Sequence, residues 1–194
     1  MSGIDSASLL TLEAYAKARP KFRAEVLAHK KHRTVALGSN VTLVFEDELT
    51  IRYQIQEMLR IEKTFEERGI QDELEAYNPL LPDGANWKAT MLIEFPEAEE
   101  RKRQLALLRG IEHNVWVQTD GGARVSAIAD EDMERSNDEK TSAVHFLRFE
   151  LPAAMRGAIE AGAALAIGID HPAYQAQTTV GAATRAALVK DLAA

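Results

Sequence analysis

The spacing of apolar and polar residues over the first 70 positions predicts helices interrupted by one β-hairpin. Ser6 or Ser8 is a suitable N-cap for a first helix that runs to about Arg19. Pro20 suits the first turn of a second helix, and Asp47 is a natural N-cap for a third. The expected elements are a helix to residue 19, a helix over 21–31, strands over 34–37 and 41–45 joined by Gly38-Ser39-Asn40, and a helix over 48–68 closed by Gly69.

After residue 86 the pattern changes to the alternation typical of strands. From Trp87 to Phe95 every second residue is apolar, so one face of this strand is expected to be buried. Asp120-Gly121-Gly122 separates two further β-rich runs, which is a strong hairpin signal. The expected elements are strands over 87–95, 115–119, 124–129, 142–151 and 165–170, with helices over 96–109, over 152–161 and from 181 onward.

These elements predict an α+β fold: N-terminal helices with a β-hairpin, then a mostly antiparallel sheet with helices packed on one face. We expect the strands over 87–95 and 142–151 and the hairpin at 120–122 to belong to one sheet. Residues 1–194 are expected to form a single domain, and the loop over 78–86, which contains Pro79, Pro82 and Gly84, is the candidate subdomain boundary.

Composition and charge exclude several classes of function. The 194 residues include no cysteine, so the chain cannot build a thiolate zinc site, ligate an iron–sulfur cluster through thiolates or use a thiol nucleophile. A net charge of −7 disfavours binding to nucleic acid or to an anionic membrane. No apolar run approaches the roughly 18 residues of a membrane-spanning helix. A cytoplasmic protein with no evident cofactor motif is therefore expected.

Glu62 falls within the apolar stripe of the helix expected over 48–68, together with Ile55, Leu59 and Phe65. A buried, unpaired carboxylate is costly unless it stays protonated or gains a partner. Glu62 is therefore a candidate catalytic acid–base group or metal ligand. The alternative is that the helix leaves the core before Glu62, or that an arginine pairs with it.

The opposite face of the same helix carries Arg52, Gln56 and Arg60 at spacings of four residues. Such a row of side chains can donate hydrogen bonds to a carboxylate or phosphate, and it also suits an acidic patch on a partner protein. The alternative is an ordinary solvated face with pairing between neighbouring turns.

Three groups with metal-ligand chemistry occur in the helix expected over 21–31 and just beyond it. Glu25, His29 and His32 have spacings of four and three residues, which can place them on one face. This pattern suits the binding of a divalent metal ion. The alternative is favourable placement of cationic side chains near a helix C-terminus.

Two further histidines lie on or beside expected strands. His145 has the same strand parity as Leu147 and Phe149, so its side chain is expected on the apolar face and is a second catalytic candidate. His171 follows a strand end, where residues often contact ligands. A hydrogen-bonded structural role is the alternative for both.

Several stretches form recognisable motifs. They are SLLTLEAY over 8–15, FEDELTIRYQIQEMLR over 45–60, YNPL over 77–80, NWKAT over 86–90, KTSAVHFLRF over 140–149 and DHPAY over 170–174. Together they resemble a bacterial family catalogued as domain of unknown function 3501. The resemblance covers nearly the whole chain and implies an association with rubrerythrin-like di-iron proteins and iron–sulfur proteins, whose genes neighbour those of the family.

Two functions from different classes follow. The first, from the resemblance, is an accessory protein of a cytoplasmic redox or oxidative-stress system that binds a rubrerythrin-like or iron–sulfur partner. The second is a small enzyme or metal-dependent ligand-binding protein that uses a buried carboxylate and histidines.

Overall fold

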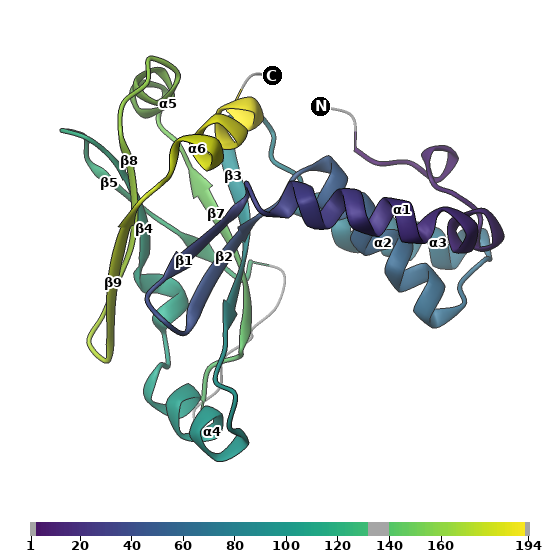
Figure 1. Cartoon of the computed structure of the whole chain (residues 1–194), viewed down its shortest axis with the longest axis horizontal. Coiled ribbons are helices and arrows are strands. Elements are labelled where there is room, and N and C mark those ends of the chain that lie inside the picture. The colour runs from purple at the N-terminus through teal and green to yellow at the C-terminus, as the bar shows by residue number, and fades with distance from the viewer. Residues whose placement is uncertain (1–2, 132–139, 193–194) are drawn as a thin grey trace.

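The computed structural model describes residues 3–131 and 140–192, and Figure 1 shows the arrangement of its elements. The N-terminal part contains α1 (Leu12–Lys30), β1 (Thr34–Leu37), β2 (Val41–Phe45), α2 (Glu48–Glu62) and α3 (Glu67–Tyr77). The rest contains β3 (Asn86–Ile93), α4 (Ala98–Leu107), the 3-10 helix η3 (Ile111–Asn114), β4 (Val115–Thr119), β5 (Arg124–Ser126), β6 (Ile128–Ala129), β7 (Val144–Glu150), α5 (Ala153–Glu160), β8 (Leu165–His171), β9 (Tyr174–Thr179), α6 (Ala182–Val189) and the 3-10 helix η4 (Lys190–Leu192). The predicted α+β class is confirmed.

The first helix is continuous through Pro20, so the expectation of two helices was wrong. Thr11 is the N-cap of α1, and its hydroxyl accepts a hydrogen bond from the backbone of Ala14. The side chains of Tyr15 and Val26 are buried on either side of the proline. Packing on both sides of Pro20 therefore holds the helix together despite the missing backbone donor.

The helix α2 ends six residues earlier than expected. It begins with a capping box, in which the Asp47 side chain accepts from the Thr50 backbone and the Thr50 hydroxyl accepts from the Asp47 backbone. It ends at Glu62, and Lys63 then adopts the left-handed conformation with φ 55°. Gly69 consequently lies inside α3 and does not close the preceding helix.

Within the described residues, the strands form two antiparallel sheets. The first has the order β1-β2-β3-β7-β6 and the second the order β5-β4-β8-β9. The β1–β2 hairpin is confirmed, and the strands expected over 87–95 and 142–151 pair directly as β3 and β7. Tyr174 links the two sheets at one edge, because its hydroxyl donates to the Leu37 carbonyl at 2.6 Å.

The hairpin at 120–122 lies in the second sheet, so the single sheet expected from the sequence was wrong. The run expected as one strand over 124–129 is split at Ala127: β5 pairs with β4 in one sheet and β6 pairs with β7 in the other. A chain that changes sheets in this way closes the corner of a sandwich. Period-two alternation does not reveal the change, because each short strand satisfies it locally.

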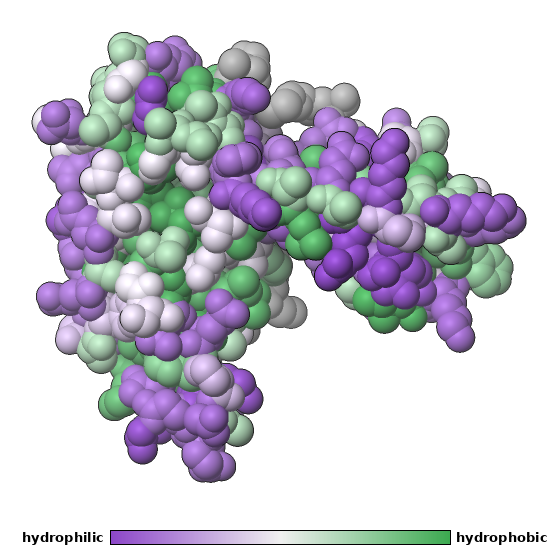
Figure 2. Space-filling model, in the orientation of Figure 1, coloured by the Kyte–Doolittle hydropathy of each residue, from purple (hydrophilic) through white to green (hydrophobic). Residues whose placement is uncertain are grey.

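Most of the buried hydrophobic side chains in the described part of the chain belong to two separate clusters. The larger lies between the two sheets and includes Phe45, Trp87 and Phe149, while the smaller holds the helices α2 and α3 against the N-terminal segment. Figure 1 shows α1–α3 projecting as an arm from the first sheet, on the side away from β8 and β9. Figure 2 shows that α4, at the bottom of the view, has a mainly hydrophilic surface. Among the described residues, no helix has the length and apolarity needed to cross a membrane.

Candidate metal centre

His145 lies near the start of β7 with its side chain in the core between the sheets. It is fully shielded from solvent, as are its strand neighbours of the same parity, Leu147 and Phe149. The inward orientation predicted from strand parity is therefore confirmed. A buried imidazole must satisfy both ring nitrogens, so its partners define the local chemistry.

Asp130, directly after β6, fixes the orientation of the His145 ring. Its Oδ2 lies 2.5 Å from His145 Nδ1, and its Oδ1 accepts a hydrogen bond from the Phe146 backbone at 2.9 Å. The backbone of Asp130 is left-handed, with φ 47°, which aspartate tolerates better than most residues. Because an ionised carboxylate only accepts hydrogen bonds, Nδ1 carries a proton and the His145 Nε2 points away from Asp130.

Glu112 and Thr141 lie at this second ring nitrogen. Glu112 belongs to η3, and Thr141 precedes β7, with its backbone N–H bonded to the carbonyl of Leu105 in α4 at 3.0 Å. His145 Nε2 lies 2.8 Å from Thr141 Oγ1 and 3.8 Å from Glu112 Oε2. The Ser142 carbonyl oxygen is 3.1 Å from Nε2, and Thr141 Oγ1 donates to Glu112 Oε2 at 3.2 Å.

Glu112, Asp130 and His145 can supply ligands to a metal ion. Within residues 3–131 and 140–192, they are the one trio of such side chains whose ligand atoms all lie within 4.8 Å of one another. Ligands about 2.1 Å from an ion are separated by roughly 3.0–3.4 Å in octahedral or tetrahedral geometry. The 2.8–3.8 Å separations around His145 Nε2 bracket that range. Strand parity identified His145, but no local pattern linked it to Glu112 or Asp130.

Glu62 is exposed to solvent, so its interpretation as a buried acid–base group was wrong. The apolar stripe of α2 is buried only as far as Leu59, and Ile61 is already 60% exposed. The helix passes beyond the small core of the arm before it reaches Glu62, which was the alternative recognised from the sequence.

Arg52, Gln56 and Arg60 do not form an open row of donors. The N-terminal segment crosses this side of α2. The Gln56 side chain is buried and bonds both backbone groups of Leu10, accepting at 2.7 Å and donating at 3.2 Å. Arg52 donates to the Ser8 carbonyl at 2.8 Å, and Arg60 donates to a neighbouring glutamate at 3.2 Å. Recognition of a partner through these residues stays a prediction.

The remaining candidates are not brought together as metal ligands. His171 is buried, and its Nε2–H donates to the Arg109 carbonyl at 3.0 Å while its Nδ1 accepts from the Ala173 backbone at 3.2 Å. Among the described residues, Glu25, His29 and His32 do not form a ligand cluster. The helix α1 ends at Lys30, so the helical spacing that would align His32 with Glu25 no longer holds.

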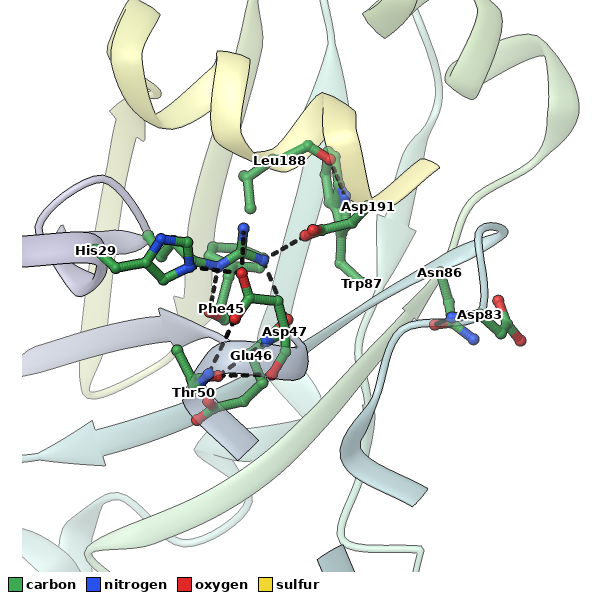
Figure 3. A network of polar contacts seen from close by, with 11 residues as sticks. His29, Phe45, Glu46, Asp47, Thr50, Asp83, Asn86, Trp87, Leu188 and Asp191 are labelled. Atoms are coloured by element: carbon green, nitrogen blue, oxygen red, sulfur yellow. Dashed lines mark hydrogen bonds and ion pairs between the residues drawn. The ribbon is translucent and has the colours of Figure 1, made fainter. Parts of the chain in front are cut away.

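His29 instead belongs to a polar network around Arg33, which is 2% exposed. Figure 3 shows His29, Asp47 and Asp191 within this network. His29 Nε2 lies 2.6 Å from Asp47 Oδ2. The Arg33 guanidinium donates to the carbonyls of Phe45 (2.9 Å) and Glu46 (3.1 Å) and contacts the carboxylates of Asp47 (3.3 Å) and Asp191. The network joins the end of α1, the start of α2 and the C-terminal η4.

Asp191 makes the stability of the protein depend on pH. Burial raises the pKa of its carboxyl from 3.8 to about 6. The contact with Arg33 acts in the opposite direction and lowers this pKa, but the Arg33 guanidinium also bonds Asp47 and two backbone carbonyls. The folded chain therefore binds this proton more tightly than the unfolded chain. The stability linked to this proton is fully present below about pH 3.8 and is lost as the pH rises through about 6.

We expect the free energy of unfolding of the wild type to fall relative to that of Asp191→Asn as the pH rises from about 3.8 to about 6. Urea unfolding of both proteins measures this difference. Glu57, whose carboxyl has its pKa lowered from 4.5 to about 2 by the Arg19 contact, does not interfere, because it contributes equally in both proteins. Parallel curves for the two proteins would contradict the assignment.

The comparisons with known proteins are consistent with the resemblance noted in the sequence. A family model described as "Protein of unknown function (DUF3501)" matches residues 3–192. A crystal structure of a novel protein of unknown function from Burkholderia pseudomallei K96243 is 55% identical, with a TM-score of 0.94, and the match covers 98% of this chain and 100% of that one. A search of curated proteins found no match.

Proposed function

This chain belongs to the DUF3501 family of proteins of unknown function, and we propose that it binds a divalent transition-metal ion between His145 and Glu112. The observation that supports the proposal is the 3.8 Å separation of His145 Nε2 from Glu112 Oε2, in a site shielded from solvent. An ion about 2.1 Å from each atom bridges this separation.

Asp130 contributes by holding the histidine ring. Histidines that ligate metals commonly donate their other ring N–H to a carboxylate, which fixes the tautomer and makes the ligating nitrogen a better donor. The 2.5 Å contact between Asp130 Oδ2 and His145 Nδ1 has this arrangement. Asp130 is itself held by the Phe146 backbone, so the ring has little freedom to turn away.

The ligand atoms favour particular metals. The potential ligand atoms are one imidazole nitrogen, a carboxylate oxygen, the Thr141 hydroxyl and the Ser142 carbonyl oxygen. The chain has no cysteine to supply a thiolate. Mixed nitrogen and oxygen sets suit Mn²⁺, Fe²⁺ and Zn²⁺ better than the soft Cu⁺ ion. Because Glu112 and Thr141 are also buried, solvent screens the attraction between the ion and the Glu112 carboxylate only weakly.

Binding to a rubrerythrin-like or iron–sulfur partner in the cytoplasm stays a prediction from the family resemblance. The Arg52, Gln56 and Arg60 face gives it little support, because the N-terminal segment already bonds Arg52 and Gln56, and Arg60 is paired within its own helix. The buried metal site is therefore the function that the geometry favours.

Calorimetric titration of the chelator-treated protein with Zn²⁺, Mn²⁺ and, without oxygen, Fe²⁺ tests the proposal. We expect one ion per chain for at least one metal. His145→Gln and Glu112→Gln should remove this binding, because the first removes the imidazole nitrogen and the second replaces the carboxylate with a neutral, weakly ligating amide. Asp130→Asn should weaken it by about 10–100-fold, because the ring is no longer held in place.

His171→Gln is the matched control, because His171 is equally a buried histidine with both ring nitrogens bonded. It should bind the metal as the wild type does. Circular dichroism and thermal unfolding of each metal-free variant establish that it is folded. A wild type that takes up no ion, or a folded Glu112→Gln variant that binds as tightly as the wild type, would refute the proposal.

A further inference from the structure

A hollow on the opposite face of the first sheet is separate from the metal centre. It lies between the outer face of β2, β3 and β7 and the helical arm, and it has a volume of about 290 Å³. On β7 the side chain of Phe146 faces this hollow, whereas that of His145 faces the core. We call it the arm cavity. Its apolar lining includes Val44, Ile51, Leu80, Leu92 and Phe146.

Glu46 brings a carboxylate into this lining, in which the apolar side chains stand beside the polar ones of Lys30, Thr50, Gln54, Tyr77 and Thr90. The residue directly follows β2, is only 8% exposed and lines the arm cavity. Among the described residues, Thr90 is the one hydrogen-bond partner of the Glu46 side chain, with its hydroxyl donating to Oε1 at 2.6 Å. Figure 3 shows Glu46 beside Asp47 and Thr50.

A carboxylate in such a place is costly unless it gains a donor or a counter-charge. Thr90 supplies one donor, whereas an ionised carboxylate has acceptor sites for about four. The Arg33 guanidinium bonds the backbone carbonyl of Glu46 and not its side chain. Oε2 is therefore available to a donor that enters the arm cavity.

We infer that the arm cavity binds a small organic amine, with the ammonium group on Glu46 and the apolar body against Val44 and Phe146. Pockets for small ligands are mostly apolar, with a few polar groups that fix orientation, and about 300 Å³ is the lower end of their range. The arm cavity has this size, and it combines an apolar surface with several polar groups, Glu46 among them.

Lys30 is the second charged group at the cavity, and it does not make an anionic ligand more favourable than an amine. This residue lies in the last turn of α1 and is half-buried. A lysine side chain can extend its ammonium group into water while its methylene groups stay in contact with apolar surface. Glu46 is shorter, is bonded to Thr90 and is held at a strand end. The buried charge that a ligand meets is therefore negative.

Three probes with one phenyl ring and different head groups test the inference. They are 2-phenylethylamine, 2-phenylethanol and 3-phenylpropanoate, each titrated into the full chain and followed by backbone amide NMR shifts. We expect the amine to bind at least tenfold more tightly than the alcohol, because the alcohol can still donate to the carboxylate but lacks the positive charge that strengthens the hydrogen bond. The shifts should be confined to β2, β3, β7 and the facing helices. An alcohol or carboxylate that binds as tightly as the amine would overturn the inference, as would binding of none of the three.

Matched variants identify the site. Glu46→Gln keeps the acceptor for Thr90 but removes the charge, and it should weaken amine binding at least tenfold. Glu94→Gln makes the same charge change at an exposed position and should have no effect. Val44→Phe should block the cavity, whereas Thr42→Phe, which lies on the same face of β2 outside the cavity lining, should not. Equal weakening by Glu46→Gln and Glu94→Gln would refute a role for Glu46.

The His145→Gln variant should bind the amine as the wild type does, because His145 faces the other side of the sheet. Loss of metal binding with amine binding retained, or the reverse, therefore separates the two proposals.

Discussion

Replacing Arg33 with methionine should lower the free energy of unfolding by about 3–5 kcal/mol at neutral pH, because it leaves buried carboxylates without their counter-charge. Arg33 is 2% exposed and contacts the carboxylates of Asp47 and Asp191 as well as two backbone carbonyls. Methionine can fill much of the volume but cannot donate a hydrogen bond. For a chain of this size the melting temperature should fall by roughly 6–20 °C, as measured by calorimetry.

The double variant Arg33→Met, Asp191→Asn is the matched test of the cause. If the loss arises from uncompensated charge, removing one of the two carboxylates should recover part of the stability lost in the single variant. If instead the loss arises from packing alone, the two variants should unfold at the same temperature. An Arg33→Met protein as stable as the wild type would show that the network contributes little.

The Phe45→Ala substitution should cost about 3–5 kcal/mol, because it opens a cavity in the centre of the main core. The Phe45 side chain is fully buried, and its ring centroid lies 5.9 Å from that of Trp87 and 6.3 Å from that of Phe149. These three aromatic rings belong to adjacent strands of the first sheet. Urea unfolding of the variant measures the loss.

Phe65→Ala is the control with the same chemical change. Phe65 is 75% exposed in the turn between α2 and α3, so its truncation should alter the free energy of unfolding by less than about 0.5 kcal/mol. Similar losses at both positions would contradict the assignment of Phe45 to the core and Phe65 to the surface.

The parts of the fold that were predictable from sequence are those that local rules determine. The β1–β2 hairpin follows from its turn residues, Asp47 caps α2 as an aspartate at that position should, and the inward orientation of His145 follows from strand parity. Each of these features depends on residues within a few positions of one another.

The features that were missed depend on tertiary structure. The division into two sheets is made at Ala127, where neither short strand departs from the expected alternation. Glu62 follows the helical period of the stripe, but the core of the arm does not extend to it. The proposed metal site joins η3, the end of β6 and the start of β7, so Glu112 and Asp130 approach His145 only through the pairing of the strands and the packing of η3.

The most direct test of the proposed metal centre is an anomalous-difference map from crystals grown with Zn²⁺ or Mn²⁺, recorded at the absorption edge of the metal. We expect one strong peak within about 2.4 Å of both His145 Nε2 and Glu112 Oε2, with Asp130 still bonded to Nδ1. The same crystals of His145→Gln should lack this peak. Wild-type crystals with no peak between these two atoms, at a metal concentration that saturates binding in solution, would contradict it.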